Sequence, residues 1–333
     1  YHDLKFEGKI LIIDGSDEDI FKNSSNIIIS YKNLEIKHLK TNLFAFASII
    51  ENLSSIDTDF VSFLGDDDYA IPSGIDACIN HLNNNKDLSA VQGSGLMLSL
   101  PNFKNIPHIE RQGNYEGPLR LEKKASQRFI NHYLDYHTPF FAVYRTALFK
   151  KVFGYCSLEE LKLNCPFFTI AEEQLQSSLS FIFGKFDRIE NLHVIRGMHD
   201  KRQPDMKKST SITSKEDKQK SIDFFSKKIS EAINESECLS KDYLEKITIE
   251  GINSFLKPPK KNLSINLFFI LKKSIRKVLT LFSLLEFSRE LRRNIFNRKE
   301  INIENLLKKE NIYHKDFIYV YNSILYNDNY KDK

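Results

Sequence analysis

The chain has 333 residues, of which 41% are hydrophobic and 28% are charged. This is the composition of a folded globular protein, and it excludes a disordered or collagen-like chain. The net charge is only +4, which by itself does not indicate a nucleic acid as the partner.

The cysteines give no sign of a disulfide framework or a zinc site. They lie far apart, without a Cys-x-x-Cys pair or a histidine at zinc-finger spacing: Cys78, Cys156, Cys165 and Cys238. We therefore expect reduced, mostly buried thiols in a cytoplasmic protein. The chain shows no charged-then-apolar leader and no uncharged run of about 18 residues, so neither secretion nor a membrane-spanning helix is predicted.

The first 200 residues alternate between strand-like and helix-like patterns. Short apolar runs predict strands at residues 9–14, 60–64, 88–100, 140–144 and 186–196. Helical periodicity predicts helices at residues 41–55, from Pro72 onward, at 146–153 and at 171–183. This alternation is typical of the α/β class, in which ligands gather at the C-terminal ends of parallel strands.

The remainder of the chain is expected to be helical. Residues 201–221 are polar and without periodicity, which predicts a flexible loop or linker. Helical patterns follow at residues 222–256, 263–287 and 303–326. We therefore expect a catalytic domain over 1–200, a linker over 201–221 and a helical C-terminal region over 222–333.

Residues 257–299 carry twelve Lys and Arg residues and few acidic ones, so the rest of the chain has a net negative charge. Apolar residues are interleaved with these cations. Such a segment suits a helix lying on an anionic membrane surface, and it would strand charges in a bilayer core. The alternative is a helical hairpin that packs on the catalytic domain with a basic outer face.

Three consecutive aspartates, Asp66, Asp67 and Asp68, follow the predicted strand at 60–64. Like charges this close are costly unless a cation neutralises them. Asp66 and Asp68 have the Asp-x-Asp spacing that holds Mg²⁺ or Mn²⁺ together with phosphate oxygens, so they are the predicted metal ligands. The alternative is a solvated acidic turn before the helix that begins at Pro72.

Four separated segments of the first 200 residues carry a recognisable pattern. They are Ile13-Asp14-Gly15-Ser16, residues 62–69, residues 141–154 with Tyr144-Arg145, and Glu172-Glu173-Gln174-Leu175. In this order they resemble the family 2 glycosyltransferases of the GT-A fold, and more closely a bacterial sub-group that carries Phe-Leu-Gly-Asp-Asp-Asp-Tyr. The last segment is usually Glu-Asp or Asp-Asp in the family and is Glu-Glu here.

The resemblance implies a GT-A fold, Rossmann-like, with a mostly parallel sheet and flanking helices. It also implies that a first nucleotide-binding strand is missing, and we expect an open sheet edge beside residues 9–14. By position, it places Asp14 at the nucleobase or ribose, Asp67 at the ribose, and Asp66 and Asp68 at the metal and the diphosphate. Asp14 could equally be a turn residue that caps Ser16.

The resemblance further implies single displacement with inversion, which needs one general base. Glu173 aligns with the usual base, and Glu172 is its rival. Adjacent residues of a helix point about 100° apart, so only one of the two can face the acceptor. Either could instead be a solvated acid at a helix start.

The segment after the last predicted strand holds two further candidates. In related enzymes a His or Arg at this place reaches the metal or the diphosphate, which makes Arg196 a donor-binding candidate and His199 a metal-ligand candidate. A lone histidine is more often structural, and His199 has that alternative. No spacing indicates a site for His132, His137 or His193.

The sequence thus predicts a metal-dependent glycosyltransferase that uses Mg²⁺ or Mn²⁺ and moves a sugar from a nucleotide-sugar donor to a glycan or lipid-linked acceptor. Its expected setting is bacterial surface polysaccharide synthesis at the cytoplasmic face of the membrane, without a nucleic-acid partner. One alternative is a sugar-phosphate nucleotidyltransferase, which would need a Gly-rich, basic phosphate loop near the first strand. Another is a catalytically silent scaffold of the same fold that binds a glycan.

Overall fold

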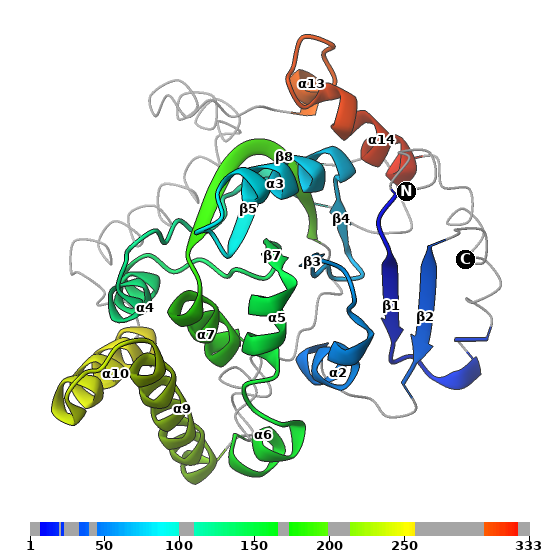
Figure 1. Ribbon diagram of the computed structural model, residues 1–333. Helices are drawn as coiled ribbons and strands as arrows, with labels where there is room; N and C mark the ends of the chain where they lie inside the picture. Colours follow the sequence, from blue (N-terminus) through cyan, green and yellow to red (C-terminus); the bar gives the residue numbers. More distant parts are fainter. Residues whose placement is uncertain are drawn as a thin grey trace, which may run out of the picture.

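The computed structural model describes residues 7–19, 21–22, 33–39, 45–99, 110–165, 173–198, 214–256 and 303–325. Strands and helices alternate as far as Met198, and the described residues beyond it form helices only (Figure 1). The α/β class predicted from the sequence is therefore confirmed.

The main sheet has six strands. Five of them lie in the order β3-β7-β5-β8-β4, and β6 pairs with β5. Their bounds are β3 (Phe60–Ser62), β4 (Asp68–Ala70), β5 (Ala90–Ser99), β6 (Glu110–Tyr115), β7 (Val143–Arg145) and β8 (Phe186–Met198). A separate parallel pair is formed by β1 (Ile10–Asp14) and β2 (Leu34–His38).

The main sheet is mixed, which corrects the expectation of a mostly parallel one. Parallel pairing joins β5 to β8, whereas the pairs β3–β7, β5–β7, β5–β6 and β4–β8 are antiparallel. Parallel neighbours need a crossover of a dozen or more residues, usually a helix. Only residues 63–67 separate β3 from β4, which is too short for such a crossover. Strand β4 therefore lies at the other end of the strand order, where it pairs with β8 in the antiparallel sense.

Among the described residues, no strand pairs with the second edge of β1 or of β3. Lys9, which precedes β1, lies 3.4 Å from the carboxylate of Asp57, which precedes β3. This exposed ion pair brings the start of the two-stranded sheet close to the edge of the main sheet. The open edge expected beside residues 9–14 stays a prediction.

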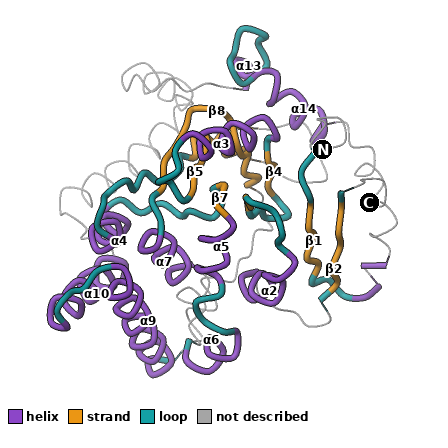
Figure 2. Tube along the Cα trace, viewed as in Figure 1, coloured by secondary structure: helices purple, strands orange, loops and turns teal. Residues whose placement is uncertain are grey.

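Helices cover both faces of the main sheet. Their bounds are α2 (Ala45–Asn52), α3 (Pro72–Asn84), α4 (Ala125–Leu134), α5 (Thr146–Phe153), α6 (Leu158–Asn164) and α7 (Leu175–Phe183), and a short 3-10 turn, Leu53–Ser55, follows α2. Neighbouring residues of a strand point to opposite faces. Accordingly, Ala90 packs with α4, α5 and α7, while Val91 packs with Cys78 and Leu82 of α3 (Figures 1 and 2).

Glycine allows α3 to approach β8 closely. A Cβ built at Gly74 would lie 2.1 Å from the carbonyl oxygen of Leu192. No side chain fits at that distance, so helix and strand contact each other through backbone atoms. Pro72 occupies the first turn of this helix, where its missing N–H costs nothing, as the sequence predicts.

The C-terminal helices are part of the same folded unit. Helix α9 (Lys215–Ser236) and helix α10 (Lys241–Leu256) contribute Phe225, Ile233 and Ile247 to the core around α4 and α7. Helices α13 (Ile303–Leu306) and α14 (His314–Leu325) pack against the α3 side with Leu306, Phe317 and Val320. The helical character expected for the region is confirmed where it is described.

The prediction of a linker over 201–221 is wrong for residues 215–221, which belong to a helix. Helix α9 begins at Lys215 because the side chain of Ser214 accepts a hydrogen bond of 3.0 Å from the N–H of Asp217, as an N-cap does. Residues 215–221 are thus helical, while residues 201–213 and the basic segment 257–299 lie outside the described residues.

The thiols agree with the expectation from spacing. All four cysteines are unpaired; Cys78, Cys156 and Cys165 are buried, and Cys238 is exposed. Within the described ranges, no helix is both long enough and apolar enough to cross a membrane.

Candidate functional site

The aspartate triplet lies where the chain leaves β3 and enters β4. Asp66 and Asp67 are in the turn, and Asp68 is the first residue of β4. The turn is closed by a hydrogen bond of 3.3 Å from the N–H of Asp68 to the carbonyl of Gly65. Asp66 is exposed, whereas the side chain of Asp68 is only 4% exposed. The two predicted metal ligands therefore differ sharply in their surroundings.

Asp68 is held by the last core strand. The register of β4 on β8 places it opposite Arg196, whose Nε lies 4.0 Å from Oδ2 of Asp68. Its Oδ1 accepts a hydrogen bond of 3.1 Å from the N–H of Gly197. A buried carboxylate needs such partners, because desolvation otherwise disfavours its charge. The structure thus brings together two residues that the sequence assigned separately to the metal and to the donor.

Arg196 lies over two aromatic rings. Its guanidinium carbon is 5.0 Å from the ring centre of Tyr115 and 4.9 Å from that of Phe141. The two rings meet edge to face at 5.5 Å. A guanidinium stacked on rings keeps its donors in its own plane, which is the geometry that binds carboxylate or phosphate oxygens. The side chain is therefore fixed in orientation before any ligand is bound.

The oxygens of two aspartates converge above Gly65. A Cβ built at Gly65 would lie 3.0 Å from Oδ1 of Asp67 and 3.2 Å from Oδ2 of Asp68. Carboxylate oxygens are the ligands that Mg²⁺ and Mn²⁺ prefer, and such ions keep waters and phosphate oxygens in their remaining positions. The donor set fits a hard divalent cation, although no group of three or more His, Cys, Asp or Glu side chains gathers within the described residues.

Asp14 has the local role that was the alternative to nucleotide binding. Its Oδ1 accepts a hydrogen bond of 2.8 Å from the N–H of Ser16 at the end of β1. Hydrogen bonds from Ser16 lower the pKa of Asp14, so the carboxyl is ionised near neutral pH. The turn is braced further by a hydrogen bond of 2.8 Å between the ring Nε2 of His38 and the carbonyl of Ser16. Its role toward a nucleotide stays a prediction.

Glu173 begins the turn that leads into α7. Residues 173 and 174 form a wider, π-type turn, a form that recurs at functional sites. The carboxylate of Glu173 accepts a hydrogen bond from the hydroxyl of Tyr136, which in turn accepts one of 2.7 Å from Nε2 of Gln174. The helix predicted over 171–183 is confirmed for Leu175–Phe183. The rival acid Glu172 and the metal-ligand candidate His199 lie outside the described residues.

One loop, residues 135–139, connects the two halves of the site. Tyr115, which lies beneath Arg196, forms a hydrogen bond of 2.8 Å with the hydroxyl of Thr138. Two residues earlier in the same loop, Tyr136 contacts Glu173. Two residues of chain span at most about 7 Å. Arg196 and Glu173 are therefore linked through contacts with one loop.

Electrostatics leads to the same grouping. Burial raises the pKa of Tyr115, while its hydrogen bond to Thr138 and the charge of Arg196 oppose this, and the charges of Glu173 and Asp68 add to it. Three charged candidates thus lie within electrostatic range of one phenol. The sequence had assigned them to the base, the metal and the donor.

Tyr144 and Arg145, which lie in one of the four segments that carry the family resemblance, have structural roles. The Tyr144 hydroxyl donates to the carbonyl of Pro139 at 2.8 Å, and its side chain is fully buried. Arg145 donates to the carbonyls of Leu88 and Leu82 at 2.9 and 2.5 Å. They connect β7 to the loop 135–139 and to the end of α3.

Sequence reasoning did not find Tyr115, Thr138 or Tyr136. Tyr115 ends β6, a strand that the apolar pattern did not reveal. Tyr136 follows His132 and Tyr133 and precedes His137, and this polar, ring-rich run was the only signal available. It was read as lacking a site because neither histidine had a partner at a metal-binding spacing.

No protein-family model and no curated protein matches the chain. Among solved structures it is similar to the crystal structure of S. aureus TarS 1-349, with a TM-score of 0.44 and 15% identity over 76% of this chain and 64% of that one. The same TarS fragment in complex with UDP gives a TM-score of 0.39 and 15% identity at the same coverage. A further S. aureus TarS structure gives 0.38 and 17%, covering 76% of this chain and 39% of that one.

The chain therefore spans less than two thirds of the TarS chains that it matches.

Proposed function

We propose that the protein is a metal-dependent, inverting glycosyltransferase. It would move a sugar from a nucleotide-sugar donor to a glycan or lipid-linked acceptor in bacterial surface polysaccharide synthesis. The observation that carries the proposal is the series of contacts from Arg196 to Tyr115, from Tyr115 to Thr138, and from Tyr136 to Glu173. These contacts support a single site. The guanidinium of Arg196 and the buried carboxylate of Asp68 lie at one end, and Glu173, an acid suited to proton transfer, lies at the other.

The donor end of the site would hold the diphosphate. Asp66 and Asp68 would hold Mg²⁺ or Mn²⁺, which when bound stabilises the negative charge of the leaving nucleoside diphosphate, and Asp67 would bind the ribose. Arg196 is held by ring contacts and by Asp68, so its planar donors would bind phosphate oxygens at a small cost in side-chain order. His199 follows on the chain and remains a candidate ligand to the same ion.

The acceptor end of the site would activate a hydroxyl. Glu173 takes the proton from the acceptor hydroxyl as its oxygen attacks the anomeric carbon. The bond from that carbon to the donor phosphate oxygen breaks, and its electron pair leaves with the nucleoside diphosphate. One displacement inverts the anomeric centre, and it needs no covalent intermediate.

The nucleotidyltransferase alternative is disfavoured by the turn after β1. That reaction needs a basic, Gly-rich loop to hold a triphosphate. Asp17, Glu18 and Asp19 follow the turn, and Lys22 is paired with Glu18 at 2.9 Å, so this segment keeps a net negative charge that would repel phosphate. The membrane surface predicted for residues 257–299 stays a prediction, since that segment lies outside the described residues.

The test is sugar transfer from a panel of nucleotide sugars with Mn²⁺, Mg²⁺ or a chelator. We expect one donor to be consumed only with a divalent ion. The Glu173→Gln variant keeps the size of the side chain but cannot accept the proton, so turnover should fall by roughly 10²–10⁴-fold with donor affinity nearly unchanged. Exposed Glu190 on β8 provides the control, because Glu190→Gln should retain full turnover.

Glu172→Gln tests the rival base. A large loss in this variant beside a small loss in Glu173→Gln would reverse the assignment. Full activity in both variants would remove the pair from the chemistry. A silent scaffold would consume no donor in any condition.

A further inference from the structure

Tyr136 is the residue outside the predicted site that contacts its general base. It lies in the loop 135–139 between α4 and β7, and its hydroxyl lies between Glu173 and Gln174. No motif in the sequence pointed to it. Its contacts with Glu173 and Gln174 indicate a role for Tyr136 that the proposed reaction does not yet include.

The chemistry of the three groups decides where the hydroxyl proton lies. The amide nitrogen of Gln174 can only donate, and an ionised carboxylate can only accept. Nε2 of Gln174 donates to the Tyr136 oxygen at 2.7 Å. The single proton of Tyr136 is therefore directed at Oε1 of Glu173.

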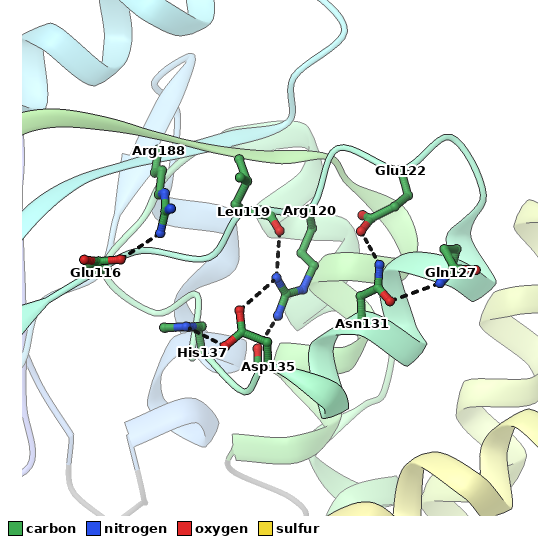
Figure 3. Close-up of polar contacts among 9 residues, drawn as sticks. All are labelled: Glu116, Leu119, Arg120, Glu122, Gln127, Asn131, Asp135, His137 and Arg188. Atoms are coloured by element: carbon green, nitrogen blue, oxygen red, sulfur yellow. Dashed lines mark hydrogen bonds and ion pairs between the residues drawn. The ribbon is translucent and has the colours of Figure 1, made fainter.

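The loop that carries Tyr136 is held on both sides. Buried Arg120 donates to the carbonyl of Leu119 at 2.7 Å and to the carbonyl of Asp135, and its Nη1 lies 3.7 Å from the Asp135 carboxylate (Figure 3). His137 contacts the same carboxylate at 3.2 Å (Figure 3). Beyond Tyr136, Thr138 is held by Tyr115 at 2.8 Å. Because the loop is held on both sides of Tyr136, the hydroxyl of this residue is kept in one position.

The phenol of Tyr136 keeps the same protonation state across the pH range in which activity would be measured. Partial burial and the neighbouring Glu173 carboxylate raise the pKa of Tyr136, which is 38% exposed, above its usual value, so the phenol stays protonated. The adjoining ring of His132, centred 4.8 Å away, is buried, and burial holds the pKa of His132 well below 6.5. It is neutral and adds no charge beside the pair.

We propose that Tyr136 is a positioning residue for Glu173: it holds Oε1 of the carboxylate by a hydrogen bond, so that Oε2 is the atom that takes the proton from the acceptor hydroxyl. This inference rests on the proposed function. A carboxylate held by one oxygen cannot rotate away from the acceptor, and a base in the correct orientation lowers the barrier. Gln174 sets the direction of the donor.

The test is Tyr136→Phe, which removes the hydroxyl and keeps the ring. A hydrogen bond to a charged group that is lost in the reacting complex corresponds to roughly 10- to 100-fold in rate. We expect kcat for sugar transfer to fall by that order while KM for the donor stays within about twofold. Gln174→Met, which removes only the donor to Tyr136, should give a smaller loss of the same kind.

Tyr133 offers a matched control. It lies on α4 one turn earlier, and its hydroxyl forms a hydrogen bond of 3.0 Å with Ser178 of α7. Tyr133→Phe therefore removes an equivalent bridge between the same elements without touching Glu173. A purely structural role predicts equal losses in the two variants, whereas positioning predicts that kcat falls only in Tyr136→Phe.

A double variant separates this inference from the proposed function. If Tyr136 acts through Glu173, adding Tyr136→Phe to Glu173→Gln should cost less than twofold further. Full activity of Glu173→Gln would overturn the base assignment itself. A severe loss in Glu173→Gln beside an unchanged kcat in Tyr136→Phe would overturn the positioning role alone.

A readout without activity completes the test. In protein labelled with ¹³C at tyrosine Cζ, the Tyr136 resonance, identified by its loss in Tyr136→Phe, should shift in Glu173→Gln while that of exposed Tyr319 on α14 stays in place. This holds even if no donor in the panel is consumed. An unmoved Tyr136 resonance would show that the hydrogen bond is absent and would overturn the inference.

Discussion

Asp68 combines two demands in one side chain. It is nearly fully buried, paired with Arg196 and bonded to the N–H of Gly197, yet its Oδ2 lies on the same side of Gly65 as the carboxylate of Asp67. Asp66, two residues earlier, is exposed. Asp68 therefore has a structural role as well as the predicted ligand role, whereas Asp66 has the predicted ligand role alone.

We expect Asp68→Asn and Asp66→Asn to differ in stability and agree in metal binding. Loss of the buried charge leaves Arg196 without its ion pair, which costs roughly 1–3 kcal/mol of unfolding free energy, whereas an exposed substitution changes it by at most about 0.5 kcal/mol. Calorimetry of Mn²⁺ with a nucleoside diphosphate should show weakened binding in both. Wild-type binding in both variants would exclude the triplet as the cation site.

At the scale of elements, the C-terminal region stabilises α4, the helix that leads into the loop of Tyr136. Glu237, just after α9, accepts hydrogen bonds of 2.8 and 2.9 Å from the N–H and the hydroxyl of Ser126 in the first turn of α4. Lys124, the N-cap of α4, makes no side-chain cap of its own. A residue 111 positions away in the chain therefore caps the helix that leads into the loop of Tyr136.

Glu237→Ala should lower the free energy of unfolding by about 1–2 kcal/mol, because it removes both the cap and a favourable charge at a helix N-terminus. Glu235, which forms an exposed ion pair with Lys151, is the matched control. Glu235→Ala should cost less than about 1 kcal/mol. Urea denaturation measures both, and equal losses would show that the Glu237 bonds contribute no more than a surface ion pair.

At the scale of the whole molecule, His132 and His193 are buried as neutral rings in the part of the chain that the structure describes. Burial lowers the pKa of His193 to about 4 and holds that of His132 well below 6.5. An unfolded chain takes up these protons near pH 6.5, and the folded protein does not. Stability is therefore complete above about pH 6.5 and falls as the pH drops toward 4.

Each such histidine should reduce the free energy of unfolding by up to about 1.4 kcal/mol per pH unit within that window. His193→Gln should flatten the dependence between about pH 6 and pH 5, where most carboxylates remain ionised. Urea denaturation of both proteins at several pH values gives the two slopes. An unchanged slope in the variant would mean that His193 is protonated in the folded state.

Local patterns in the sequence determined the elements whose causes are local. The apolar run of β1, the proline that starts α3 and both ends of α5 follow from residues a few positions apart. The acidic triplet and Glu173 were also visible, since their chemistry depends on residue type. The sequence alone therefore predicted the α/β class and the residues with reactive side chains.

Only the tertiary structure decided how those residues meet. Strand β4 has three residues, too few for a periodic pattern, and its pairing with β8 joins Asp68 to Arg196. Tyr115 and Tyr136 enter the site because β6 and the loop 135–139 lie beside residues distant in sequence. Contacts between distant residues depend on the packing of the whole chain, which no window of neighbouring residues contains.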